Sequence, residues 1–343
     1  MKQSILYSFV DGSSGPSPYV DLTLGGSGKI YGATAGVSDA FVFELAPPAK
    51  SGEAWTENVI CDFCSGAYTS ISSLISDGKS RLYGTTYDGG RYHFGSVFVL
   101  TKEAGSSWKE QDIYSFQSND GNLVFPGGLV LSAAGVLYGV AAQGGPSGSY
   151  LGTVFSLTPP SGDGPWTEST LYTFENTTAG YRPLGTLAID SAGTLYGTTL
   201  EGGLGGGNVF ELVPPAVPGG TWIESVLYSF LSGSDGAQPI AGVIFDSTGA
   251  LYGTTQFGGN FACSFGGGED GCGTAFKLIP PSTQGGTWTE ETLHAFAGGN
   301  DGVDPGPSQL LILGTTIYGT TLQGGDPETC DGVGCGTVFE ITQ

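Results

Sequence analysis

One short segment combines side chains that acid–base catalysis commonly uses: Arg91, Tyr92 and His93, followed by Phe94. Histidine changes its charge near neutral pH and serves as a general base in many enzymes. An arginine beside it could hold a ligand carboxylate through two hydrogen bonds. We therefore predict His93 and Tyr92 as candidate catalytic residues. The alternative is an exposed loop that contains a histidine with no catalytic role.

A second arginine, Arg182, is expected on the same face of the molecule as Arg91. The other eight basic residues are expected on the opposite face, at strand ends beside it, within a strand or at the N-terminus, whereas this face carries acidic loops. Two cations in a negative field are either paired with neighbouring carboxylates or available to a ligand. In the second case they would bind a carboxylate-bearing ligand such as a uronic-acid polysaccharide.

Several aromatic residues fall in the same loops, and we predict Tyr181, Tyr150 and Phe257 as ligand-binding residues together with the two arginines. Aromatic rings stack on the apolar faces of sugars. The alternative is that these rings pack the loops against one another.

The elements that would position these residues follow from an internal repeat. The run Leu195-Tyr196-Gly197-Thr198-Thr199 has five further copies of its Leu/Ile-Tyr-Gly core, with tyrosines at 31, 83, 138, 252 and 318. A repeat of this length indicates one array of similar structural units. In the fourth unit, apolar stretches at 184–190, 194–200, 208–212 and 222–230 alternate with turns rich in Gly, Pro and Asp, which predicts four short antiparallel strands.

The predicted fold is all-β: one six-bladed β-propeller domain with four antiparallel strands in each blade. A small sheet with two apolar faces must stack against others, and six such sheets close into a ring. The chain begins within a fourth strand and ends after a third, so we predict that the N-terminal strand completes the last blade and covers its edge. The predicted blades span residues 19–63, 71–116, 126–174, 183–230, 239–296, and 307–342 together with 3–9.

The repeated Leu-Tyr-Gly-Thr-Thr, Gly-Thr-Val-Phe, Trp-Thr-Glu and Leu-Tyr-Ser-Phe segments resemble the GloVer tandem repeat of bacterial choice-of-anchor proteins. The resemblance extends over essentially the whole chain. It implies a bacterial protein that is secreted or displayed at the cell surface, often through a C-terminal sorting segment. It implies no reaction, because the family is defined by its repeat.

Charge and cysteine content agree with an extracellular setting. The net charge of −22 argues against nucleic acid and anionic membranes as partners, and the sequence has no apolar run long enough to cross a membrane. Six cysteines form three close pairs, Cys61/Cys64, Cys263/Cys272 and Cys330/Cys335, which predict local disulfides and an oxidising compartment. We expect a monomer.

No cofactor or metal is predicted, with calcium left open. Zinc is disfavoured because Cys61 and Cys64 have no second ligand pair at a matching spacing. Asp301 with Asp304, or Glu269 with Asp270, could supply oxygen ligands to calcium, although none matches the EF-hand spacing.

Three functional hypotheses follow. The first is a secreted or surface-displayed binding module for a carbohydrate or another extracellular ligand. The second is a carbohydrate-active enzyme, a polysaccharide lyase or glycoside hydrolase, with one site on the same face. The third is a structural surface repeat without a small ligand. Loops that differ between blades favour one distinctive site over six equivalent ones.

Overall fold

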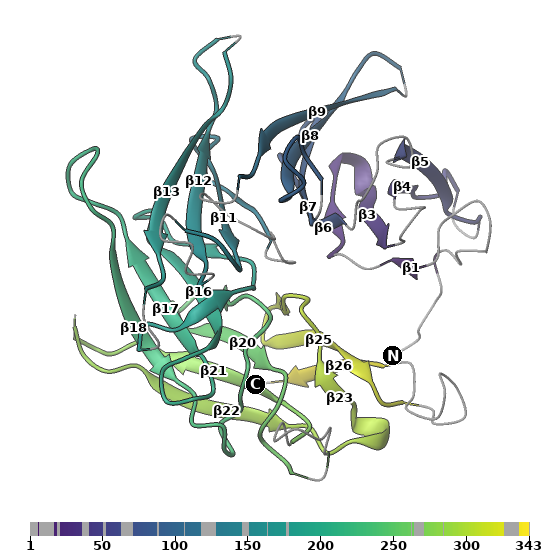
Figure 1. The fold of residues 1–343 in the computed structure, drawn as a ribbon. Coiled ribbons are helices and arrows are strands. Elements are labelled where there is room, and N and C mark those ends of the chain that lie inside the picture. Colours follow the sequence, from purple (N-terminus) through teal and green to yellow (C-terminus); the bar gives the residue numbers. More distant parts are fainter. Residues whose placement is uncertain are drawn as a thin grey trace.

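Six small antiparallel sheets follow one another along the chain and lie around a common centre (Figure 1). The computed structural model describes the chain except for residues 1–5, 7–16, 19–20, 36–40, 51–52, 63–70, 88, 106, 118–127, 146–150, 163, 176–177, 262, 264–270, 284, 326–335 and 343. The described residues contain no α-helix, and the two 3₁₀ turns are η1 (Gly26–Gly28) and η3 (Gly299–Asp301).

Each sheet is one blade, and its strands are consecutive in the chain. Blade 1 contains β1 (Ser17–Pro18), β2 (Thr23–Leu24), β3 (Ile30–Ala35), β4 (Phe41–Ala46) and β5 (Thr56–Asp62); blade 2 contains β6 (Ile71–Ser76), β7 (Arg81–Thr86), β8 (Ser96–Lys102) and β9 (Trp108–Ser115). Blade 3 contains β10 (Val130–Leu131), β11 (Leu137–Ala141), β12 (Thr153–Thr158) and β13 (Thr167–Thr173); blade 4 contains β14 (Tyr181–Pro183), β15 (Ala188–Ile189), β16 (Leu195–Glu201), β17 (Asn208–Val213) and β18 (Ile223–Ser229). Blade 5 contains β19 (Ile244–Phe245), β20 (Leu251–Thr255), β21 (Thr274–Ile279) and β22 (Thr289–Ala295); blade 6 contains β23 (Val303–Pro305), β24 (Leu311–Leu313), β25 (Thr316–Gln323) and β26 (Thr337–Thr342).

The predicted six-bladed, all-β propeller is therefore confirmed. In blades 1, 4 and 6 the first strand is split into two short pieces, such as β14 and β15, that pair with the same second strand. The described part of the chain contains no helix long and apolar enough to span a membrane.

The repeated glycine of the Leu-Tyr-Gly segment makes room for an aromatic ring inside each blade. In blade 4, Gly197 of β16 pairs with Phe210 of β17. A Cβ added at this glycine, or at its equivalent in any of the other five blades, would lie no farther than 2.6 Å from the Phe Cζ atom, which is closer than non-bonded carbon atoms can approach. The glycine is required because the phenylalanine ring occupies the place of its side chain.

That phenylalanine in turn receives a second phenylalanine from the blade before it. The ring pairs are edge-on, with centroids 5.0–5.4 Å apart, and comprise Phe116–Phe155, Phe174–Phe210, Phe230–Phe276 and Phe296–Phe339. This edge-to-face geometry is favourable for aromatic rings. The pairs join blades 2 to 3, 3 to 4, 4 to 5 and 5 to 6.

The repeated tyrosine and tryptophan form the same kind of joint nearer the opposite ends of the blades. Trp108, Trp166 and Trp222 each pack edge-on against the Leu-Tyr-Gly tyrosine of the preceding blade, with centroids 5.8–6.3 Å apart. These contacts lie within clusters of buried residues that each draw on two adjacent blades. The core is thus a series of layers between blades.

Close backbone approaches fill the centre of the ring beside blades 4 to 6. The Gln309 side-chain amide of blade 6 donates to the carbonyl oxygens of Thr186 in blade 4 (3.3 Å) and Val243 in blade 5 (3.2 Å). A side chain at Gly242 would collide with the Thr186 carbonyl. The glycine therefore lets three blades meet near the axis.

The last blade differs from the others at the strand that should lie fourth. The predicted closing strand, residues 3–9, lies outside the described residues apart from Leu6, so the closure stays a prediction. Val338 of β26 is 77% exposed, whereas its equivalents are 0% exposed: Val42, Val97, Val154, Val209 and Ala275. A groove of about 440 Å³ between blades 6 and 1 is lined by Val338, Tyr318, Leu22 and Asp21, among others. Among the described residues, no fourth strand covers this face of blade 6, whereas fourth strands complete the other five blades.

The exposed face leads to a testable prediction for the closure. Residues 3–9 repeat the sequence of 224–230 almost residue for residue, and Val209 pairs with Tyr228 there, so Val338 should pair with Tyr7. Deleting residues 1–10 should lower the free energy of unfolding by several kcal/mol, since three large apolar side chains contribute about 1.5–3 kcal/mol each. A truncated chain that remains monomeric by light scattering, with an unchanged melting temperature, would refute the closure.

Candidate functional site

The predicted catalytic segment forms a tight exposed turn between β7 and β8. The Arg91 backbone N–H donates to Ser115 Oγ (3.1 Å), and the guanidinium lies 5.6 Å from the centroid of the Tyr92 ring. His93 adopts a left-handed conformation with φ 61°, and its N–H donates to the Gly90 carbonyl (3.3 Å). Arg91 and Tyr92 are thus brought together as expected. The catalytic roles of Tyr92 and His93 stay predictions.

Tyr181 and Arg182 lie on β14 of blade 4 and share one carboxylate. The Tyr181 hydroxyl donates to Glu201 Oε2 (2.5 Å), and Arg182 Nη1 donates to Glu201 Oε1 (2.7 Å). Register explains the contact, because Tyr181 pairs directly with Glu201 of β16. Of the two alternatives for Arg182, pairing with a neighbouring carboxylate is therefore the one that the structure shows. Arg182 is not available to a ligand carboxylate in the way expected from the sequence.

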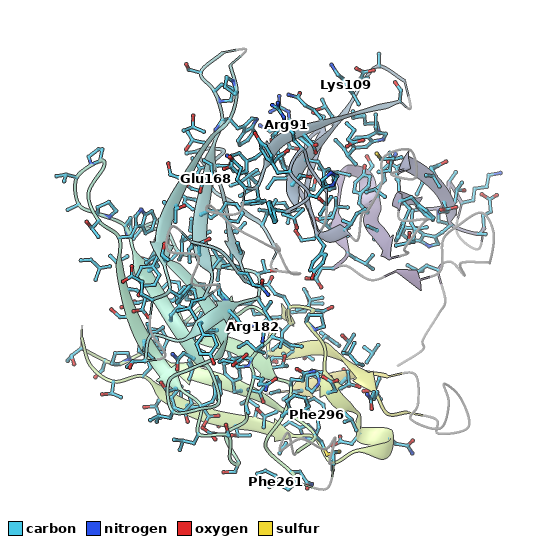
Figure 2. All side chains as sticks on the ribbon, in the orientation of Figure 1. Arg91, Lys109, Glu168, Arg182, Phe261 and Phe296 are labelled. Atoms are coloured by element: carbon cyan, nitrogen blue, oxygen red, sulfur yellow. A yellow bond between two sulfur atoms is a disulfide. The ribbon has the colours of Figure 1, made fainter. Side chains whose placement is uncertain are left out.

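The remaining predicted ligand residues are placed differently. Phe257 is 7% exposed and lies in a β-bridge with Ala237, so its ring contributes to the packed interior of blade 5. Tyr150 lies outside the described residues. Arg91 belongs to blade 2 and Arg182 to blade 4, and Figure 2 shows them in separate parts of the ring. The predicted residues that the structure describes therefore lie on three blades: residues 91–93 on blade 2, residues 181 and 182 on blade 4, and Phe257 on blade 5.

A feature that sequence reasoning missed recurs at the start of blades 4, 5 and 6. Arg182, Gln238 and Asp304 occupy equivalent positions and have φ angles of 56°, 56° and 61°. We call these three the rim residues. Each donates its backbone N–H to the preceding blade, at the carbonyl oxygens of Leu151 (2.8 Å), Gly206 (2.8 Å) and Cys272 (3.1 Å). Equivalent positions in a propeller form an arc around the axis, so the rim residues line one end of it.

The proline after each rim residue explains the backbone conformation. Pro183, Pro239 and Pro305 pack closely against glycines 152, 207 and 273 of the preceding blade, where a Cβ would meet the proline Cδ. The left-handed rim residue turns the chain into this contact. All three segments have the pattern Gly-x-x-Pro, at 180–183, 236–239 and 302–305. The pattern alone does not predict the left-handed backbone conformation of the residue before the proline.

The side chains at the rim are unusual for such a backbone. Glycine adopts a left-handed conformation without strain, whereas other residues incur of order 1 kcal/mol or more. Nevertheless the three blades carry Arg, Gln and Asp. Arg182 Nε and Asp304 Oδ1 are both buried without a hydrogen-bond partner in the described structure. Buried polar atoms of this kind are normally satisfied by water or by a ligand.

Asp304 is the acidic member of the three rim residues, and its pKa is shifted. It is 7% exposed, and burial raises the pKa of its carboxyl to about 6, although a hydrogen bond with the Gln256 side chain of blade 5 opposes the rise. Perturbed acids that lie among convergent polar groups are candidates for functional residues. The rim and its neighbours Tyr181, Glu201 and Gln256 are therefore the candidate functional site.

The proposed calcium ligands are not brought together in the part of the chain that can be described. Asp301 accepts hydrogen bonds from Ala297 N (2.8 Å) and pairs with His294 Nε2 (3.0 Å), whereas Asp304 is buried beside Gln256. Glu269 and Asp270 lie outside the described residues. No group of three or more His, Cys, Asp or Glu side chains suited to a metal ion occurs among the described residues.

One predicted disulfide is present, between Cys263 and Cys272, with Cα atoms 5.1 Å apart. A disulfide indicates an oxidising compartment. Cys330 and Cys335 lie outside the described residues, so that pair stays a prediction. The Cys61 side chain is a thiol that donates to Glu110 Oε2 (3.6 Å), so the predicted Cys61–Cys64 disulfide is wrong.

The fold and its repeated packing define the chain as a propeller built from one tandem repeat. A model of the Gloeobacter/Verrucomicrobia repeat matches residues 1–203, and the chain belongs to this family. This confirms the resemblance derived from the repeated segments. The search of curated proteins gives no match.

Solved structures of similar fold share little sequence with the chain. A PQQ-bound aldose sugar dehydrogenase from Streptomyces coelicolor has 10% identity and a TM-score of 0.57, over 95% of this chain and 94% of that one. A protein from Lactobacillus plantarum has 13% identity and a TM-score of 0.58, over 94% and 88%. The Hadza microbial sialidase Hz136 has 13% identity and a TM-score of 0.54, over 94% and 64%. At these identities the likeness extends to the fold alone.

The acidity of Asp304 predicts a pH-dependent stability. Because the folded carboxyl has a pKa near 6 and the unfolded one near 3.8, the folded state binds more protons between these values, and the free energy of unfolding falls as pH rises through this window. Asp304→Asn removes the cost of ionising the buried carboxyl. Between pH 4 and pH 7 the free energy of unfolding of this variant should therefore rise by about 1–2 kcal/mol relative to that of the native chain. Chemical denaturation at several pH values measures this.

Asp246→Asn is the matched control. Burial would raise the pKa of Asp246, but hydrogen bonds from Thr248, Ala250 and Tyr252 outweigh it and hold the pKa below its usual value. Its substitution should therefore lose stability relative to the native chain as pH rises through the acidic range. If the stabilities of both variants, relative to the native chain, changed with pH in the same direction, the raised pKa of Asp304 would be refuted.

Proposed function

We propose that the rim binds a neutral carbohydrate and that the chain works as an extracellular carbohydrate-binding module. The observation that carries the proposal is the use of Arg, Gln and Asp at three adjacent left-handed positions where glycine would be unstrained, with two buried polar atoms left without partners. Strain of this kind is retained where the side chain has a role.

The chemistry of the rim favours hydroxyl groups over a charged ligand. The positive charge of Arg182 is offset by Glu201, so the pair presents donors and acceptors with little net charge. Gln238 and Gln256 add amide groups, which both donate and accept. Tyr181, half-buried beside Arg182 and hydrogen-bonded to Glu201, supplies an aromatic ring. A sugar offers hydroxyls that both donate and accept, and it offers apolar ring faces, so it matches this mixture.

Two further facts support the proposal. Two of the solved structures of similar fold are a sugar dehydrogenase and a sialidase. The repeat family and the disulfide are consistent with a secreted or surface-displayed protein.

A second candidate function is a carbohydrate-active enzyme at the same site. The observation that favours it is the pKa of Asp304, which at about 6 is close to the value that suits a general acid or base at neutral pH. In that role Asp304 would hold a proton at its carboxyl and donate it to a departing sugar oxygen.

A substitution series to glycine separates the function of the rim from its contribution to folding. Arg182→Gly, Gln238→Gly and Asp304→Gly each relieve a left-handed residue, so the melting temperature should stay the same or rise. A glycan array followed by calorimetric titration of the best neutral glycan should show about a tenfold or greater loss of affinity in each. Ser27→Gly is the control, because Ser27 has φ 63° in a loop of blade 1 and should bind like the native chain.

Each outcome decides between the hypotheses. Native-like binding by all three rim variants would refute the rim as the site. Absence of binding to any glycan would refute the carbohydrate proposal and leave the structural surface repeat. If the native chain cleaves the glycan, and Asp304→Asn retains binding but loses turnover, the enzyme is the correct function.

A further inference from the structure

The joint between blades 1 and 2 contains a fully paired cluster of charges. Glu44 is 6% exposed and accepts from Lys29 Nζ (2.7 Å) and the Tyr31 hydroxyl (3.0 Å). Lys102 Nζ lies 3.9 Å from the same carboxylate and 5.4 Å from the centroid of the Trp108 ring. One carboxylate therefore pairs with two cations beside the tyrosine–tryptophan joint.

The next joint, between blades 2 and 3, repeats this arrangement with the carboxylate removed. Pairing registers make Arg81 equivalent to Lys29, Tyr83 to Tyr31 and Trp166 to Trp108. The position equivalent to Glu44 is occupied by Val99, which is 7% exposed. Pro159 replaces Lys102 above the tryptophan.

A groove occupies the joint where the carboxylate is missing. It has a volume of about 200 Å³ and is lined by Arg81, Tyr83, Val99, Thr101, Gln111 and Trp166, among others. Its lining residues come from β7 to β9 of blade 2 and from residues 159–166 of blade 3. Pockets for drug-sized ligands measure roughly 300–1,000 Å³, so this groove is of a size for a smaller ligand, such as one sugar unit.

Arg81 is the cation of this groove and forms no salt bridge with a carboxylate of the described residues. Its guanidinium interacts with the Tyr83 hydroxyl, and that contact together with the nearby Asp77 raises the pKa of Arg81. Asp77 Oδ1 is already used by the backbone N–H groups of residues 79, 80 and 81. An arginine fork beside a polar groove is well suited to a ligand carboxylate.

The charge distribution makes this end of the molecule the more favourable one for an anion. Residues 1–109 contain eight Lys and Arg against ten Asp and Glu, whereas residues 110–343 contain two against twenty-two. An anionic ligand is therefore strongly repelled by the later blades and hardly by the first two.

We propose that the groove between blades 2 and 3 is a binding site for an acidic sugar residue, such as a uronic acid, whose carboxylate takes the place that Glu44 holds in the preceding joint. Trp166 supplies aromatic surface for the sugar ring, and Thr101 and Gln111 supply polar partners for its hydroxyls. The site is independent of the rim, which lies on blades 4 to 6.

The test compares galacturonic acid with its methyl ester, which has the same ring but no charge. By calorimetric titration at low salt, the native chain should bind the acid roughly tenfold more tightly than the ester, and added salt should reduce the difference. Arg81→Gln should abolish the preference. Lys79→Gln, which removes an exposed cation from the same turn without lining the groove, should retain it.

A second variant tests the comparison between the joints directly. Val99→Glu restores the carboxylate of the first joint, so it should pair with Arg81 and abolish binding of the acid. Should this variant fail to fold, Arg81→Gln carries the test. Asp304→Gly should leave the binding unchanged, which separates the groove from the rim. Equal affinity of the native chain for acid and ester, no measurable binding of either, or an unchanged preference in Arg81→Gln would overturn the proposal.

Discussion

The structure depends on one repeated contact, in which a phenylalanine ring lies against a glycine of its own blade and receives the ring of a phenylalanine from the blade before. Because Gly197 has no side chain, the Phe210 ring can lie over it on the face of the sheet, and there Phe174 packs edge-on against the Phe210 ring. The contact recurs along the ring, so each blade fixes the next. In blade 6, whose fourth strand is not among the described residues, Val338 is exposed although its equivalents in the other blades are buried.

This repeated scaffold separates positions that must stay the same from positions that can change. The glycine, the two phenylalanines and the proline after each rim residue are used by the packing itself. The packing does not fix the identity of the rim side chains or of the residue opposite the repeated tyrosine, which is Glu44 at one joint and Val99 at the next. Both proposed sites arise at such free positions, so they occur once in the ring.

Much of the fold could be predicted because its causes lie in local patterns. The Leu-Tyr-Gly segments, the turns and the tryptophans each specify a strand and its position, and together they define six blades. The site could be predicted only in part. The pairing of Arg182 with Glu201 depends on strand register, and the buried place of Phe257 depends on its β-bridge with Ala237. The left-handed rim and the missing carboxylate beside Arg81 become visible only when equivalent positions are compared in space.

A crystal structure of the chain with the best-binding neutral oligosaccharide would test the central claim that the rim is a carbohydrate site. The account predicts sugar hydroxyls within about 3.2 Å of Asp304 Oδ1 and Arg182 Nε, the two buried atoms without partners. A sugar bound at high occupancy elsewhere, with ordered water on both atoms, would contradict it.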